Sequence, residues 1–543
     1  MATSRLVPSN QLLPCLLSLS AAALACVLLY RRWKRISIDQ LPGPQPQSFL
    51  LGNLGQFYRG EAAGADFAWQ QEFGHVLRIK GAIGEDCLFL SDPKAIHHVH
   101  HSGYTYQKQT MRRELARLLL GKGMPWAEAE DHKRQRKVMS PAFGSTETKA
   151  LFPIIFEAAE LLCSKWNQLD PLQNQGSAVV DVYSWMCRTT IDTIGLAAFG
   201  YRFHALEEKD NALRQAYART FSKSFGNPSK CTIFKQNMLQ YLPVPVVSFI
   251  FNHSASFDQA RETKRIATQV SEELLRTKSS ELRIGSGARD ILSLLIKANM
   301  DTGGGPKLDH DEMLASMQVV IAAGLETTAS TLTWTLFELS RHPDVQAKLR
   351  NEIRGMPTAN GGGQFTPGDL EDMPYTHAVM KESLRLHPSI YYVLRQAAKD
   401  DIIPTSTPIT TRSGQVINEI PVAKGTSVFV SIAGYNRNAS IFGDDSHSFN
   451  PERWLDNSMA KTDTPLGLYG NLMSFGSGVR SCMGWRFALL EYQTILIQLI
   501  DKFHFSVDSS VVHKIRREGG TLIMSPTVDG IVQLPLRISA AET

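Results

Sequence analysis

A glycine-rich stretch near the C-terminal end contains a cysteine and an arginine, side chains that can bind a ligand or take part in a reaction. The run FGSGVRSCMG, residues 475–484, holds three glycines, Arg480 and Cys482. An apolar helical pattern follows at 485–500, so we expect Cys482 at or just before a helix N-terminus, where the helix dipole favours a thiolate. The sulfur is therefore predicted to act as a ligand or as a nucleophile.

The other cysteines favour neither a disulfide framework nor a zinc ribbon. The set is odd in number, scattered and without a CxxC pair: Cys15, Cys26, Cys87, Cys163, Cys187, Cys231 and Cys482. A nucleophile would need a histidine base and an oxyanion site, and no local signature indicates them. A single axial thiolate on haem iron needs one sulfur, glycines that admit a flat macrocycle and a cation for a propionate. All three are present.

A second polar feature lies inside a long apolar segment. Residues 314–337 carry a single charge, Glu326, and we expect a helix through a soluble core rather than a membrane span, because a central carboxylate is costly in lipid. The run AGLETT, residues 323–328, places Gly324, Glu326 and Thr327 at mid-helix. Glycine costs about 1 kcal/mol there, and threonine hydroxyls bonding back to carbonyls are expected to open a notch.

These motifs resemble those of the cytochrome P450 monooxygenases. The FxxGxRxCxG haem signature of that family is matched at every position by Phe475, Gly478, Arg480, Cys482 and Gly484. In family order, AGLETT resembles the oxygen-activation motif, KESLRLHP contains the ExxR pair Glu382 and Arg385, and FNPERW supplies Arg453. The style of the chain is similar to the microsomal, eukaryotic, fungal type.

The resemblance implies a cofactor, heme b (iron protoporphyrin IX), and a role for each motif residue. Cys482 would be the axial metal ligand, Glu326 and Thr327 the catalytic pair, and Glu382, Arg385 and Arg453 a buried network bracing the cysteine loop. Further cofactor-binding residues by similarity are Phe475, Gly478, Arg480, Gly484, Arg136, Arg395 and His132. The chain departs from the family at His132, where a tryptophan is usual.

The implied activity is insertion of one oxygen atom from O2 into a hydrophobic small molecule, by hydroxylation or epoxidation. Electrons would come from NADPH through NADPH–cytochrome P450 reductase, with cytochrome b5 as a further partner, because the chain shows no dinucleotide-binding fingerprint of its own. The style suggests secondary metabolism and a terpenoid substrate. Two alternatives stay open: a reductase-independent haem-thiolate isomerase or dehydratase, and a non-catalytic haem sensor.

The elements that must position these residues are mainly helical. Apolar residues recur at helical spacing in 181–200, 255–276, 344–354 and 485–500, whereas β-branched and aromatic runs lie at 76–91 and after Gly520. We predict a mainly α fold with small β-sheets at the flanks. The resemblance adds the cytochrome P450 fold with an N-terminal transmembrane helix.

The N-terminal region predicts a membrane anchor. Residues 12–30 are uncharged and, at 1.5 Å per residue, long enough to span roughly 29 Å. Because the basic run 31–35 follows, we expect a short lumenal N-terminus at 1–11 and a cytosolic chain beyond. A basic, proline-rich hinge at 31–48 would join the anchor to one monooxygenase domain at 49–543, on the endoplasmic reticulum membrane. A cleaved signal peptide is the alternative.

Charge and composition set further limits. The formal charge is +5 with a pI of about 8.7, and charges of both signs are interleaved, so nothing favours a nucleic-acid surface. An acidic redox partner would suit this balance. The apolar run 241–251 contains two prolines, and it is expected to form either a core loop or a second membrane contact.

Overall fold

The computed structural model describes residues 36–208, 212–213, 215–217, 228–283, 290–300, 305–357, 365–455, 464–519 and 523–542. Three predicted segments lie outside these ranges: the terminus at 1–11, the anchor at 12–30 and the basic run at 31–35 of the hinge. Within the described ranges, no helix combines the length and the apolarity needed to cross a membrane.

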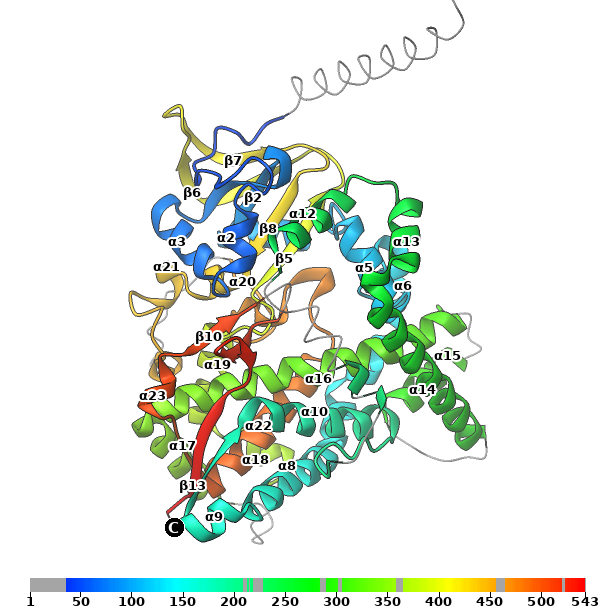
Figure 1. Cartoon of the computed structure of the whole chain (residues 1–543), viewed down its shortest axis with the longest axis vertical. Helices are drawn as coiled ribbons and strands as arrows, with labels where there is room; N and C mark the ends of the chain where they lie inside the picture. Colours follow the sequence, from blue (N-terminus) through cyan, green and yellow to red (C-terminus); the bar gives the residue numbers. More distant parts are fainter. Residues whose placement is uncertain are drawn as a thin grey trace, which may run out of the picture.

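One long helix, α16 (His310–Arg341), crosses the middle of the molecule (Figure 1). It begins with a capping box in which Asp309 accepts from the Glu312 N–H and the Glu312 carboxylate accepts from the Asp309 N–H. Most of its side chains are buried, as expected for 314–337. The segment is therefore a core helix, and its apolar composition reflects burial on all sides.

Helices α10, α8 and α22 lie on one side of α16 in this view, and the strands β2, β5 and β8 lie on the other (Figure 1). The helices of the N-terminal half are α2 (Leu54–Arg59), α3 (Gly64–Phe73), α4 (Pro93–His101), α5 (Thr110–Leu120), α6 (Ala129–Met139), α7 (Ser145–Ala150), α8 (Phe152–Asn167), α9 (Asp170–Gln175), α10 (Val182–Phe199), α12 (Lys230–Leu239), α13 (Val244–His253) and α14 (Asp258–Arg283).

The C-terminal half continues the helical layer. Its α-helices besides α16 are α15 (Ile291–Met300), α17 (Pro343–Gly355), α18 (Pro367–Glu371), α19 (Pro374–Leu386), α20 (Ile432–Asn436), α21 (Ala439–Phe442), α22 (Trp485–Lys502) and α23 (Ser509–Val512). Short 3-10 helices lie at η1 (Ala82–Gly84), η2 (Ser140–Phe143), η3 (Ala255–Phe257), η4 (Pro451–Trp454), η5 (Met473–Phe475) and η6 (Gly478–Arg480).

The largest sheet of the described chain has the strand order β1-β2-β8-β5-β3, and β2 pairs with β8 in parallel. Smaller sheets have the orders β10-β11-β12, β4-β13-β9 and β6-β7. The strands are β1 (Val76–Lys80), β2 (Asp86–Leu90), β3 (Tyr106–Gln107), β4 (Ser177–Asp181), β5 (Tyr392–Ala397), β6 (Asp401–Thr410), β7 (Val416–Val422), β8 (Ser427–Ser431), β9 (Phe503–Ser506), β10 (Ile515–Glu518), β11 (Ser525–Val528), β12 (Ile531–Val532) and β13 (Pro535–Ala540).

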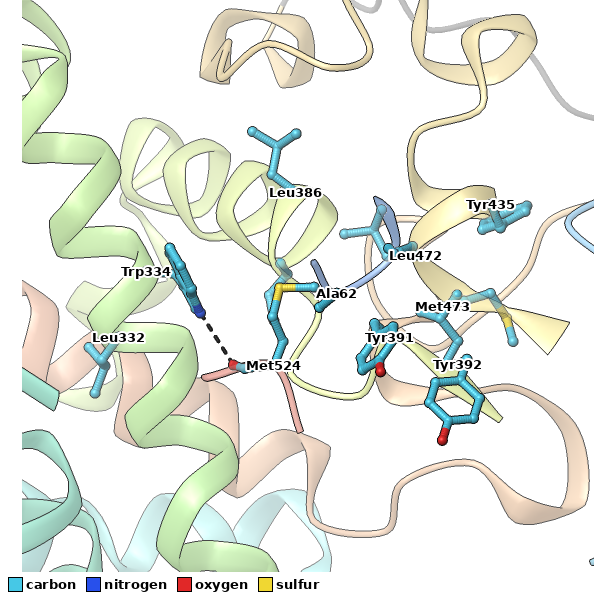
Figure 2. Packing of buried hydrophobic residues seen from close by; sticks show 14 of the residues in the cluster. Ala62, Leu332, Trp334, Leu386, Tyr391, Tyr392, Tyr435, Leu472, Met473 and Met524 are labelled. Carbon is cyan, nitrogen blue, oxygen red and sulfur yellow. Dashed lines mark hydrogen bonds between the residues drawn. The ribbon is translucent and has the colours of Figure 1, made fainter. Parts of the chain in front are cut away.

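A continuous apolar core joins the helices to the largest sheet, and Figure 2 shows part of it. Trp334 of α16 is fully buried, and its indole N–H donates to the Met524 carbonyl at 3.3 Å. The same ring stacks on His387 with centroids 4.7 Å apart. The buried indole N–H of Trp334 thus has a hydrogen-bond partner, and this bond joins α16 to the chain just before β11.

The mainly helical class with small sheets is confirmed, and α10, α14, α17 and α22 occur where helical spacing indicates them. The placement of the sheets at the flanks is wrong, because β5 and β8 lie between the predicted helices and complete the sheet begun by β1 and β2. Strand β8 is buried at all five positions, so it shows no alternation that sequence could reveal.

Gly324 has a different role from the expected opening of α16. The helix is continuous from residue 310 to residue 341, and a Cβ on Gly324 would lie only 2.7 Å from Ile194 Cγ1 on α10. The glycine therefore allows close approach of two helices and does not open the backbone.

Candidate functional site

The cysteine loop runs from η5 through η6 to the start of α22. The Cys482 N–H donates to the Phe475 carbonyl at 2.8 Å, which closes the loop across the signature. Gly478 has a φ of +66°, and a Cβ there would lie 2.1 Å from the His100 carbonyl of α4. Glycine at this position is therefore required both by the backbone angle and by the contact with α4.

The Cys482 side chain is exposed, although most of the loop is only partly accessible. Gly484, the residue preceding α22, donates its N–H to the sulfur. Desolvation by the protein packed around the sulfur raises the pKa of the Cys482 thiol, while the Gly484 N–H and the charge of the Arg136 guanidinium oppose that rise. A free thiol thus lies at a helix start with one N–H donor directed at its sulfur and the charge of Arg136 nearby, an environment that suits a metal-binding thiolate.

Positive side chains from three elements gather beside this loop. Arg136 of α6 donates to the Ser481 carbonyl at 2.7 Å, and Arg480 of η6 forms an ion pair with Glu128. Arg395 of β5 donates to the Leu394 carbonyl, and burial together with Arg480 lowers the pKa of Arg395 to about 10. Because these cations raise one another's energy, the cluster favours an anionic ligand.

Two members of this cluster carry no sequence signal. Lys108 lies within it, and burial lowers the pKa of Lys108 to about 7, with Glu128 opposing and Arg395 and Arg480 adding to the shift. Glu128 accepts from the Lys108 backbone N–H at 2.8 Å and pairs with Arg480. One carboxylate is thus shared among several cations. Neither residue stands in a recognisable motif, so spacing alone could not have found them.

His132 of α6 is buried near the same cations. The Tyr104 hydroxyl lies 2.9 Å from His132 Nδ1, and burial, followed by Lys108 and Arg480, lowers the pKa of His132 to about 4. The imidazole is therefore neutral at physiological pH. The charges of Arg136 and Arg480 act on this imidazole, so the structure brings these three residues together, and their binding of one cofactor stays a prediction.

The acid and alcohol of α16 face different neighbours. Thr327 Oγ1 donates to the Ala323 carbonyl at 2.7 Å, and Ala323 is exposed within an otherwise buried helix. Glu326 accepts from the Tyr183 hydroxyl at 3.2 Å. Burial raises the pKa of Glu326 to about 7, while the Tyr183 hydrogen bond lowers it. A carboxyl group that titrates near neutrality is suited to proton transfer.

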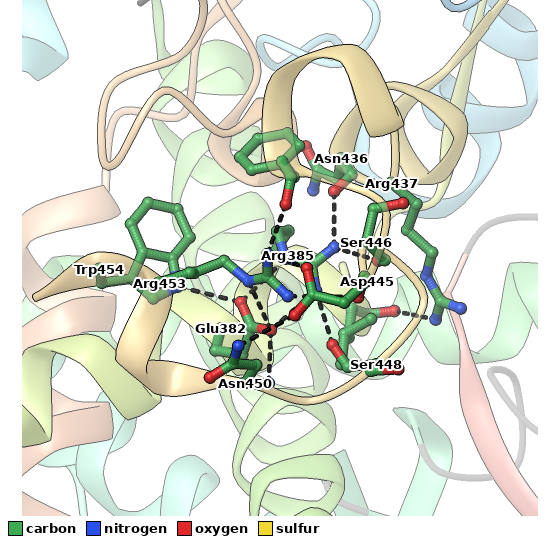
Figure 3. A network of polar contacts seen from close by, with 12 residues as sticks. Glu382, Arg385, Asn436, Arg437, Asp445, Ser446, Ser448, Asn450, Arg453 and Trp454 are labelled. Carbon is green, nitrogen blue, oxygen red and sulfur yellow. Dashed lines mark hydrogen bonds and ion pairs between the residues drawn. The ribbon is translucent and has the colours of Figure 1, made fainter. Parts of the chain in front are cut away.

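Glu382, Arg385 and Arg453 form one buried cluster (Figure 3). Glu382 pairs with Arg385 at 2.7 Å and with Arg453 Nε at 3.1 Å, and its other oxygen accepts from the Trp454 indole at 3.0 Å. Arg385 and Glu382 are fully buried. The structure therefore brings the three residues together, and it adds Trp454, which the sequence reasoning did not include.

Asn436 links this cluster to the cysteine loop. Arg385 donates to the Asn436 carbonyl at 3.1 Å. The Asn436 side chain accepts from the Met473 N–H at 3.0 Å and donates to Ser474 Oγ at 2.9 Å. Both contacts immediately precede Phe475, whose carbonyl receives the Cys482 N–H. A chain of hydrogen bonds thus runs from the ion pairs to the cysteine.

Comparison with known proteins identifies the family. The cytochrome P450 family model matches residues 42–533. Cytochrome P450 monooxygenase 91 of Postia placenta is 34% identical over 94% of this chain and 95% of its own length. Cytochrome P450 monooxygenase claQ of Ampulloclitocybe clavipes is 33% identical over 95% and 96%, and ganoderic acid synthetase CYP5150L8 of Ganoderma lucidum is 31% identical over 91% and 92%. The chain therefore belongs to the cytochrome P450 family and is a cytochrome P450 monooxygenase, with relatives among fungal enzymes.

Proposed function

We propose that this monooxygenase binds heme b through Cys482 and inserts one oxygen atom into a lipophilic metabolite. The observation that carries the proposal is the accessible Cys482 thiol, held by the Gly484 N–H next to a cluster of partly buried cations. When bound, the group supplies oxygen activation, and a thiolate favours cleavage of the O–O bond. Arg136, Arg395, Arg480, His132 and Lys108 would hold its propionates.

The chain's own residues would then control protons and geometry. Glu326 would release and take up a proton at its carboxyl group, and Thr327 Oγ1 would orient the reacting species by hydrogen bonding. Glu382, Arg385 and Arg453 would keep the cysteine loop in place through Asn436. Phe475, Gly478 and Gly484 would shape the loop around the sulfur.

The test of the ligand is Cys482→Ala. We expect the purified variant to lose the reduced carbon monoxide difference band of thiolate-ligated haem, while the exposed control Cys231→Ala keeps it. A Cys482→Ala protein with an unchanged band would remove Cys482 as the ligand.

Substrate class and electron supply form the finer part of the proposal. One relative carries the name ganoderic acid synthetase, which supports a role in secondary metabolism with a lipophilic substrate such as a terpenoid. Electrons would come from NADPH through cytochrome P450 reductase, with cytochrome b5 as an accessory donor. Turnover of a lipophilic substrate panel that depends on NADPH and reductase separates this from an isomerase or dehydratase, and any turnover excludes a sensor.

A membrane-facing surface also belongs to the proposal. The segment 241–251 is not a core loop: α13 buries Val247 and Phe251 but exposes Val244, Val246 and Phe249. Tyr241 donates to Glu85 at 2.6 Å, next to exposed Ile83, and the Ile83 N–H donates to the carbonyl of exposed Leu50. These apolar side chains would rest on the endoplasmic reticulum membrane beside the anchor at 12–30.

A further inference from the structure

Tyr183, at the first turn of α10, is tied to the acid of α16. Its hydroxyl donates to Glu326 Oε1 at 3.2 Å, and the phenol is almost completely buried. A second hydrogen bond joins the two helices two turns further along α10, where the Thr190 hydroxyl donates to the Leu325 carbonyl at 2.6 Å. The contact between the phenol and the carboxyl group therefore lies between two immobilised backbones.

The two carboxyl oxygens of Glu326 have different surroundings. Oε1 accepts from Tyr183, whereas Oε2 is buried and has no hydrogen-bond partner in the described part of the chain. An unpartnered buried oxygen is costly as a bare carboxylate atom, so the proton of a neutral carboxyl group is placed best on Oε2. Oε1 is then the anchored atom and Oε2 the atom free to exchange a proton.

Few other ionisable groups face this carboxyl group. From α10, one turn after Tyr183, the Cys187 thiol lies near Glu326, and burial raises the pKa of Cys187 well above its ordinary value, so the thiol is neutral. From β11, Ser525 is a hydrogen-bond partner of the Tyr183 phenol and does not titrate. From α22, Glu491 lies beside Thr328, which is two residues along α16 from Glu326 and so on the opposite side of the helix.

We infer that Tyr183 is a positioning residue that anchors Glu326 by Oε1, stabilises its carboxylate form and leaves Oε2 as the atom that releases the proton. When the Oε2–H bond breaks, the electron pair stays on the carboxylate, and the Tyr183 hydrogen bond to Oε1 strengthens because its acceptor is now charged. The inference rests on the proposed proton-transfer role of Glu326. It adds a residue outside the family motifs named above.

The test follows the ionisation of Glu326 directly in the holoenzyme. Infrared difference spectra over a pH series would record the carbonyl stretch of the protonated carboxyl group, and the band that disappears in Glu326→Gln belongs to Glu326. Tyr183→Phe removes only the hydroxyl. We expect the midpoint of this band to move to higher pH by about one pH unit, because a donor that favours the charged form has been lost.

Tyr492→Phe is the matched control. Tyr492 is a buried phenol of α22 that hydrogen-bonds Thr335 of α16 at 2.6 Å, away from Glu326. We expect its Glu326 midpoint to equal that of the unmodified enzyme. A midpoint in Tyr183→Phe that also equals the unmodified value would overturn the inference about Tyr183 while leaving the role of Glu326 intact.

A second measurement separates the two proposals. The fraction of NADPH oxidation that yields product would be followed against pH in the same variants. We expect Tyr183→Phe to move the midpoint of this profile in the same direction as the infrared midpoint, and Glu326→Gln to abolish the midpoint. If this pH profile were unchanged in Glu326→Gln, the proton-transfer role of Glu326 would be refuted. The effect of Tyr183 on Glu326 would then have no consequence for the reaction.

Discussion

At the scale of single residues, several buried charged side chains depend on one or two ion-pair partners. Glu382 neutralises two buried guanidinium groups and also accepts from the Trp454 indole. A buried pair adds little net stability, because its desolvation cost offsets the Coulomb attraction, but removing one partner leaves an uncompensated charge. Replacing one of these charged side chains is therefore expected to cost much more unfolding free energy than the intact ion pairs contribute.

Glu382→Ala is expected to lower the free energy of unfolding by about 3–5 kcal/mol, because Arg385 and Arg453 would remain buried without their carboxylate. Thermal unfolding and the haem absorbance per mole of protein would record the loss. The control is Glu262→Ala, which breaks an exposed pair with Arg265 on α14 and should leave the unfolding midpoint unchanged. Equal midpoints for both variants would contradict the prediction.

Glu491 of α22 gives a pH-dependent prediction. Burial raises the pKa of Glu491 to about 8, and both of its carboxyl oxygens are buried without a hydrogen-bond partner in the described part of the chain. The folded protein therefore prefers the neutral form, and this stability is complete below the unfolded pKa and is lost as the pH rises through 8. We expect Glu491→Gln to be more stable than the unmodified protein by roughly 4 kcal/mol near pH 8.

The advantage of Glu491→Gln should fall as the pH is lowered from 8 towards 4.5, because the unmodified side chain becomes protonated in the unfolded state as well. Unfolding midpoints at closely spaced pH values would show this convergence. A difference between the two proteins that does not vary with pH would mean that Glu491 keeps an ordinary pKa in the folded state.

At the scale of elements, the close approach of α10 and α16 positions both Glu326 and Tyr183. Gly324 permits this approach, since an added methyl group would overlap Ile194 Cγ1. Two effects compete at this position. A change to alanine gains about 1 kcal/mol of helix propensity, whereas overpacking costs about 1–3 kcal/mol.

We therefore expect Gly324→Ala to reduce stability by about 1 kcal/mol, with overpacking outweighing propensity. The same change made in an Ile194→Ala background should become stabilising, because Cγ1, the atom nearest to the added methyl, and Cδ1 are removed. Denaturant unfolding of the four proteins of this cycle measures the coupling. Additive effects would show that the two helices do not meet through these residues.

Sequence patterns predict some elements well and others poorly, for physical reasons. Amphipathic α14 and the uniformly apolar α16 are visible because their spacing or length is distinctive. Strand β8 is short and wholly buried, so its pattern resembles that of a core helix segment. In the site, motif spacing indicates Cys482, Glu326 and the ion-pair network. Motif spacing does not indicate Lys108 or Tyr183, because their partners are distant in the sequence and become neighbours only in the folded protein.

At the scale of the whole molecule, exposed apolar side chains lie at the end where the described chain begins. Phe49 and Leu50 lie early in the described chain, and α13 contributes Phe249. Figure 1 places α12 and α13 on the same end as β6 and β7. The proposed membrane attachment therefore has two components, the proposed anchor at 12–30 and this surface.

A chain lacking residues 1–35 is expected to keep partial binding to phospholipid vesicles, measured by co-sedimentation. Phe249→Asp in this shortened chain should reduce the bound fraction several-fold, because a charge replaces an apolar contact in the interface. The control is Val179→Asp, a similarly exposed apolar position. Val179 lies on β4, which pairs with β13, and Figure 1 shows β13 at the opposite end of the molecule. Equal losses from both changes would assign the binding to general hydrophobicity.

The contact between Gly478 and His100 has a consequence for how the protein is made. His100 Nδ1 lies 3.2 Å from the Ser477 carbonyl, so α4 supports a loop that is 377 residues further along the chain. The loop therefore cannot reach its final shape until the ribosome has produced nearly the whole polypeptide. Prosthetic-group capture is therefore expected late in biogenesis, because the cysteine loop needs contacts with α4 that span most of the chain.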